Sequence, residues 1–130
     1  MSQVARVLLG LLVIFVVSMV GDVLLPETGM PKPMYWSPVA TLIGLVGAFL
    51  GGLVARRGLL LPALAVWLCL WCYLTWALYQ IADGTGNASL SSILHFNGAA
   101  IAASFAALIV GILAGQWLAR RLTARPVATA

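Results

Sequence analysis

Four long apolar segments, separated by short polar ones, make up most of the chain. They cover residues 7–25, 38–55, 59–82 and 93–119. Each is long enough to form an α-helix that spans a hydrocarbon core of about 30 Å. The pattern predicts an all-α fold: a polytopic membrane protein with a single four-helix transmembrane domain at residues 1–130, in which residues 120–130 form a short cytoplasmic tail.

The polar connectors contain residues that end or begin helices. Pro26, Pro31 and Pro33 exclude a regular helix between the first two spans. Ser37 and Pro38 form a favourable start for the second span, because serine caps a helix and proline needs no donor at the first position. Arg56, Arg57 and Gly58 leave room only for a tight hairpin between the second and third spans. Ser91 or Ser92 is expected to cap the fourth.

The composition excludes an ordinary soluble domain. The chain has 130 residues, of which 63% are hydrophobic and 8% are charged, so it lacks the polar surface that a soluble fold needs. Four spans leave no residues for a separate soluble domain, and a large aqueous active site is therefore not expected.

The charges predict the orientation of the spans. One side of a four-span arrangement holds Arg6, Arg56, Arg57, Arg120, Arg121 and Arg125, and the other holds Asp22, Glu27, Lys32 and Asp83. By the positive-inside rule, both termini should be cytoplasmic in the inner (plasma) membrane. The formal charge of +4 does not indicate nucleic-acid binding, because six of the seven cations lie next to apolar spans, where they orient the chain or meet anionic lipid.

Small residues predict how the second and fourth spans pack. On a helix, Gly44, Gly47 and Gly51 share one face of the second span, and Gly111 and Gly115 share one face of the fourth. Small faces let membrane helices approach closely. We therefore expect these two parallel helices to meet through their glycines, with Ser104 on the same seam.

Residues 46–57 and 110–121 are similar, since both begin Val-Gly and end Ala-Arg-Arg. This similarity has two alternative explanations. Either a two-helix hairpin was duplicated, or topology alone places arginines at the end of any helix that has a face of small residues and runs toward the cytoplasm.

The third span has two different faces. Trp67, Trp71, Leu74 and Leu78 form one, and Cys69, Cys72, Tyr73, Trp76 and Gln80 form the other. We expect the first to face lipid or a partner, with Trp67 and Trp71 as a possible partner face, and the second to point inward.

Cys69-Leu-Trp-Cys72 places two sulfurs on one side of a helix, where they could bind a soft metal or alternate between thiol and disulfide. The motif resembles those of inner-membrane disulfide-bond oxidoreductases and mercuric-ion transporters, but no second cysteine pair is present to relay electrons or metal. The alternative is two small apolar core residues.

A set of polar residues lies near the outward ends of the spans, namely Asp22, Gln80, Asp83, His95 and Asn97. They could line an outward-facing vestibule, with His95 and Asp22 as a proton-linked pair. The candidate polar site consists of Asp22, His95, Asn97 and Ser104, because Ser104 continues the polar seam that Asn97 starts. In the alternative interpretation they sit at the interface and cap or anchor helices.

Three functions remain open. The first is an accessory or structural subunit of a membrane complex, which acts through helix packing. The second is a small oligomeric transporter or channel for a small solute or lipid. An enzyme that uses the cysteine pair is the third, and we do not expect it, because no second cysteine pair is present and a thiolate near mid-bilayer is costly. We expect no cofactor or metal either: the sequence has no phosphate-binding loop and no clustered histidines, which argues against an ATPase and a metalloprotease. Expected partners are membrane lipids and either copies of the chain or other membrane subunits.

Overall fold

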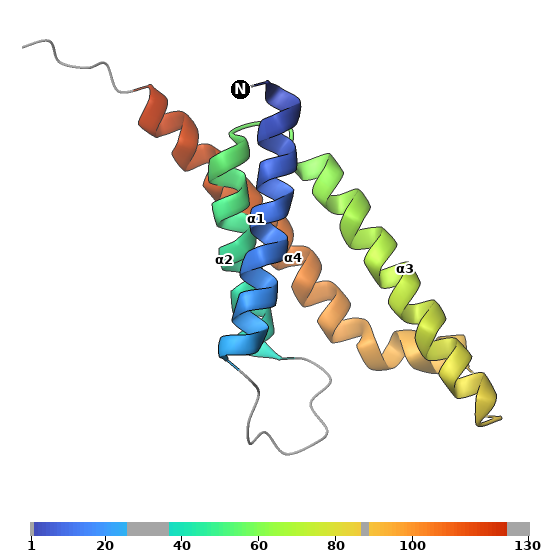
Figure 1. Ribbon diagram of the computed structural model, residues 1–130. Helices are drawn as coiled ribbons and strands as arrows, with labels where there is room; N and C mark the ends of the chain where they lie inside the picture. The colour runs from blue at the N-terminus through green and yellow to red at the C-terminus, as the bar shows by residue number, and fades with distance from the viewer. Residues whose placement is uncertain (1, 26–36, 87–88, 125–130) are drawn as a thin grey trace, which may run out of the picture.

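The computed structural model describes residues 2–25, 37–86 and 89–124, which form four α-helices (Figure 1). These are α1 (Gln3–Leu24), α2 (Pro38–Ala55), α3 (Leu60–Gly84) and α4 (Leu90–Thr123). All four are long and apolar enough to cross a membrane, as expected of a multi-pass membrane protein. The connector at 26–36 and the end of the tail at 125–130 lie outside the described residues.

Serines begin three of the helices. Ser2 Oγ accepts from Ala5 N (3.2 Å), Ser37 Oγ from Ala40 N (3.0 Å) and Ser89 Oγ from Ser92 N (3.3 Å). The expected cap at Ser37 is therefore confirmed.

The fourth helix is longer than its apolar segment. It begins at Leu90, after Ser89, and continues to Thr123, so the expected cap at Ser91 or Ser92 and the expected start at 93 are wrong. The first turn contains Ser91 and Ser92 and is partly polar. A prediction based on apolar residues therefore begins the helix too late in the sequence. At the other end, Arg120 and Arg121 stabilise the last turn, where the helix dipole favours cations.

Three helices form the main packing unit. α2 lies between α1 and α4, and its contact with α4 is the most extensive in the molecule. Ala48, Ala55, Leu59, Leu108 and Ile112 are buried at the centre. α3 leans away from α1 and α2 and packs mainly on α4 (Figure 1).

Gly111 and Gly115 of α4 lie against the backbone of α2. A Cβ added at Gly111 would lie 2.7 Å from Leu45 O, and one at Gly115 would overlap Phe49 O. On α2, a Cβ at Gly52 would lie 2.6 Å from Ile112 O. Since real Cβ atoms do not approach so closely, only glycine allows this separation of the two helices.

The glycines named for the α2 side of the seam do not face α4. A Cβ at Gly51 would lie 2.7 Å from Gly10 O on α1, and one at Gly47 would lie 3.3 Å from Ile14 O, also on α1. A Cβ at Gly44 would meet no described atom within 4 Å. The reason is that α2 has a neighbour on each side, so its small residues divide between two partners.

The turn after α2 is strained. Arg57 N donates to Ala55 O (2.7 Å), which closes a γ-turn around Arg56. Arg56 has φ 62° and Gly58 has φ 73°. Glycine adopts positive φ without cost, but at Arg56 the conformation is unfavourable for a residue with a Cβ. Gln3 Nε2 donates to Arg57 O (2.6 Å) and so joins the start of α1 to this turn.

Candidate functional site

Ser104 joins α3 to α4 near the middle of both helices. Its hydroxyl oxygen accepts from Trp67 Nε1 (3.0 Å) and from Trp71 Nε1 (3.2 Å), and the hydroxyl donates to Ile101 O (3.0 Å). The Trp67 ring also packs against Phe105, with ring centroids 5.1 Å apart. We call Trp67, Trp71 and Ser104 the indole–serine cluster. Hydrogen bonds of this kind hold helices together where water is excluded.

The orientation of α3 differs from the expected one at Trp67 and Trp71, whereas Leu74 and Leu78 of the same predicted face are exposed, as expected. Trp67 and Trp71 are half-buried against α4, so the expectation that they form an outward partner face is wrong. An indole N–H in an apolar environment needs an acceptor, and Ser104 supplies one to both rings. The helical wheel separates the two faces but does not say which one turns inward.

The exposed side of α3 carries side chains with polar or reactive atoms. Cys69, Tyr73, Trp76 and Gln80 all lie exposed, and Tyr73 and Trp76 contact each other with ring centroids 6.1 Å apart. We call these four residues the outer stripe. Cys69 and Cys72 are both free and exposed, which contradicts their interpretation as small core residues.

A cavity lies where all four helices meet. Its volume is about 290 Å³, and its lining includes Ser18 from α1, Thr41 and Gly44 from α2, Trp71 from α3 and Ser104 from α4. The open space beside Gly44 is part of it. Ser18 and Thr41 are not among the residues predicted for the site. Their hydroxyl groups lie within apolar spans, and this is the sequence signal that identifies them.

Most of the hydroxyls at this central cavity already have partners. Thr41 Oγ1 donates to Ser37 O (2.9 Å), Ser37 Oγ accepts from Ala40 N, and the indole–serine cluster uses Ser104. Few hydrogen-bonding positions therefore remain for a polar solute, and the polar atoms here serve mainly to shape and join the helices.

The structure does not bring the predicted polar residues together. Ser104 lines the central cavity, whereas Asn97 lines a separate groove near the end of α3. Asn97 Nδ2 donates to Ile93 O (2.9 Å) on its own helix. His95 is exposed on α4. Asp22 lies in the last turns of α1, and its side chain is outside the described part of the structure.

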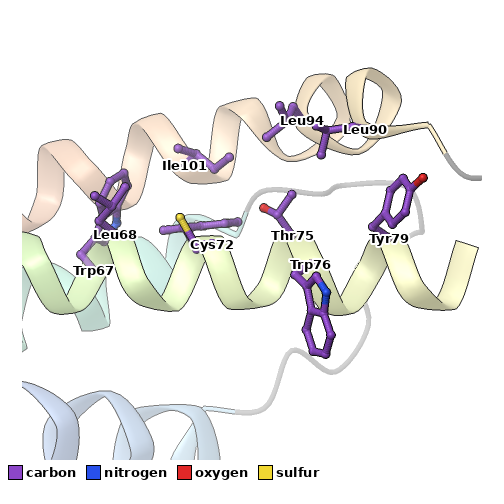
Figure 2. Close-up of a pocket in the computed structure, with 10 residues that line it drawn as sticks. Trp67, Leu68, Cys72, Thr75, Trp76, Tyr79, Leu90, Leu94 and Ile101 are labelled. Atoms are coloured by element: carbon purple, nitrogen blue, oxygen red, sulfur yellow. The ribbon is translucent and has the colours of Figure 1, made fainter.

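A second, apolar groove separates the outer halves of α3 and α4 (Figure 2). Its volume is about 520 Å³. Cys72, Thr75 and Tyr79 point toward it from α3, and Leu94 and Ile101 point toward it from α4 (Figure 2). Trp76 points away from α4 (Figure 2). Over this length, α3 has open space toward α4, and Trp76 of the outer stripe also lines the groove although its ring points away from α4.

Within the described residues, no group of three or more His, Cys, Asp or Glu side chains could hold a metal ion. The chain matches no known family model, and neither a curated protein nor a solved structure is significantly similar to it.

Proposed function

We propose that this is a small integral protein of the inner membrane, with both termini cytoplasmic, that acts as an accessory or structural subunit. In this proposal α3 packs against a transmembrane helix of another subunit. The proposed orientation rests on the arginines, which gather at the start of α1, the end of α2 and the end of α4.

The chemistry of the outer stripe carries this proposal. In the middle of α1 the exposed side chains are apolar, among them Leu8, Leu12, Phe15 and Met19, as lipid contact requires. The outer stripe of α3 instead presents a thiol, a phenol, an indole and an amide. Tyrosine and tryptophan are enriched at protein interfaces, and polar side chains within a membrane are stabilised by hydrogen bonds to other helices.

The weak attachment of α3 supports the same function. α3 is held through its start at Leu60, near the buried Ala63, and through the indole–serine cluster. Beyond that cluster an open groove lies between its outer half and the first half of α4. A second helix against the outer stripe would bury aromatic surface that now lies exposed, with Tyr73 at 65% and Trp76 at 58%.

A cross-linker attached to Cys69 should identify this contact in native membranes. With Cys72→Ser, Cys69 becomes the sole cysteine, and a maleimide–benzophenone reagent on it should give one discrete protein adduct after irradiation. Cys69 lies on the outer stripe, within reach of any helix that packs there. The adduct is detected by gel mobility and identified by mass spectrometry.

The matched control places the same reagent on α1. Leu12 is at the same depth from the arginine end as Cys69, because each is the tenth residue of its helix. Leu12 is 55% exposed, so Leu12→Cys in a background without Cys69 and Cys72 should give lipid adducts alone. Lipid adducts alone at both positions would contradict the packing function.

The central cavity favours a second candidate, a small oligomeric transporter or channel. All four helices line it, and Ser18 and Thr41 give it some polarity. Its volume of about 290 Å³ suits a small neutral solute more than an ion.

Filling this cavity should test the second candidate. Proteoliposomes in a glycerol gradient should swell faster than empty vesicles if the cavity conducts, and Gly44→Leu should return the rate to that of empty vesicles. Gly98→Leu is the control, because a Cβ at Gly98 also meets no described atom within 4 Å, and Gly98 is absent from the lining of the central cavity. Equal swelling of wild-type and empty vesicles would exclude glycerol conduction.

A further inference from the structure

Another cavity lies at the arginine end and is chemically unlike those described above. Its volume is about 310 Å³, and its lining is Gln3, Arg6, Arg56, Arg57, Ala119, Arg120 and Thr123. Four arginines from three separate parts of the chain thus surround one space. The start of α1, the turn after α2 and the end of α4 bring them together.

Within the described residues, no acidic side chain compensates these positive charges. The sequence contains three acidic residues. Asp22 lies in the last turns of α1, at the opposite end from Arg6, Asp83 lies near the far end of α3, and Glu27 lies outside the described residues. In the described part of the chain, none of the four arginines forms an ion pair. Like charges this close repel one another, most strongly next to an apolar medium of low dielectric constant.

The neutral lining groups do not supply a negative charge. Gln3 Nε2 donates to Arg57 O (2.6 Å), and Thr123 Oγ1 donates to Ala119 O (3.1 Å) and Arg120 O (3.0 Å), so both already bond to the backbone. The charged groups of the cavity are all guanidinium donors. An anion that bridges several of them would offset their repulsion.

We infer that this arginine-lined cavity binds a phosphate group, as carried by an anionic phospholipid of the adjacent leaflet or by a soluble phosphate compound. Guanidinium groups match phosphate oxygens with paired, charge-assisted hydrogen bonds. The backbone at Arg56 is consistent with this role, because it keeps an arginine at φ 62° where glycine would be unstrained. The inference is independent of the proposed packing function of α3.

Arg121 provides an internal comparison. It carries the same charge as its neighbour Arg120 and lies in the same last turn of α4. However, its guanidinium lies over the ring of Trp117, with Cζ 4.0 Å from the ring centroid, and Arg121 is not part of the cavity lining. Removing either charge changes the basic surface equally, but only Arg120 belongs to the proposed site.

Native mass spectrometry of the purified full-length protein should test the inference. The protein is titrated with dioleoylphosphatidylglycerol, with dioleoylphosphatidylcholine as the zwitterionic comparison. We expect the anionic lipid to bind at least tenfold more tightly. Arg6→Gln and Arg120→Gln should each weaken its binding about tenfold, because each removes a charge-assisted contact, whereas Arg121→Gln should change it less than about twofold.

The outcomes separate the site from general surface charge. Equal losses in Arg120→Gln and Arg121→Gln, or wild-type binding in both cavity variants, would overturn the inference. Circular dichroism confirms that each variant stays helical, and Arg56→Gln replaces any variant that does not. If inorganic phosphate at millimolar concentration displaces the lipid with the same arginine dependence, phosphate recognition stands and the source is soluble. If it does not, the source is the lipid.

Discussion

Replacing Gly115 with alanine should force α4 away from α2 and lower the free energy of unfolding by about 3 kcal/mol, as expected for severe overpacking. The added Cβ would overlap Phe49 O and would also lie 2.9 Å from Leu53 N. Both are backbone atoms in the C-terminal half of α2, so neither can move aside without displacing the helix. Unfolding of the purified protein in increasing mole fractions of sodium dodecyl sulfate, followed by circular dichroism, measures the loss.

Gly98→Ala is the matched control for Gly115→Ala, because Gly98 lies in the same helix and a Cβ there would meet no described atom within 4 Å. This variant should unfold like the wild type or slightly later, since alanine favours a helix over glycine by up to about 1 kcal/mol. Equal stability of the two variants would show that the close approach of α2 and α4 does not determine stability.

Ser104→Ala should release the outer part of α3 and cost about 2 kcal/mol. The change leaves the indole N–H groups of Trp67 and Trp71 without their acceptor in an apolar environment, at about 1 kcal/mol for each lost hydrogen bond. Hydrogen–deuterium exchange in detergent should rise along α3 and stay unchanged in α1 and α2. The detergent titration described for Gly115→Ala measures the energetic loss.

Ser18→Ala is the control for the serine change. Ser18 lines the same central cavity but lies on α1, and it is not part of the indole–serine cluster. Its replacement should leave exchange in α3 unchanged. If Ser104→Ala also left that exchange unchanged, the hydrogen bonds to Ser104 would not be what holds α3 against α4.

The number and type of the elements follow from the sequence because both depend on local properties. Four uninterrupted apolar segments predict four helices. The cap at Ser37 and the hairpin at Arg56 and Arg57 depend only on residues that are neighbours in the sequence. The apolar segment is shorter than α4, because the first turn of α4 contains serines and its last turn contains arginines, and both turns are helical without being apolar.

The orientation of α3 could not be obtained in the same way. Both of its faces carry large apolar residues and one carries polar atoms, so hydrophobicity alone does not distinguish inward from outward in a membrane protein. The deciding factor is a pair of hydrogen bonds from Trp67 and Trp71 to Ser104, more than 30 residues away. The pattern of residues within α3 does not show that its tryptophans will contact Ser104 of α4.

The glycines show the same limit. Their spacing indicates that helices approach closely, and Gly111 and Gly115 do lie against α2. It does not indicate how a helix with two neighbours divides its small residues, and on α2 Gly52 contacts α4 while Gly47 and Gly51 contact α1. At the candidate site, the sequence indicates Ser104 as a polar residue within the fourth span. It does not indicate that the indoles of Trp67 and Trp71 both donate to Ser104.

The extensive contact between α2 and α4 also determines when the fold can be completed. A ribosome delivers the helices in order, so α1 and α2 can pair as a hairpin long before α4 exists. During that interval the side of α2 around Leu45, Phe49 and Gly52 lacks its partner. Only α4, which leaves the ribosome after α3, covers it, and the same helix brings Ser104 to α3 and Arg120 to the other arginines. A chain truncated before α4 would therefore lose the packing core, the attachment of α3 and the arginine cavity together.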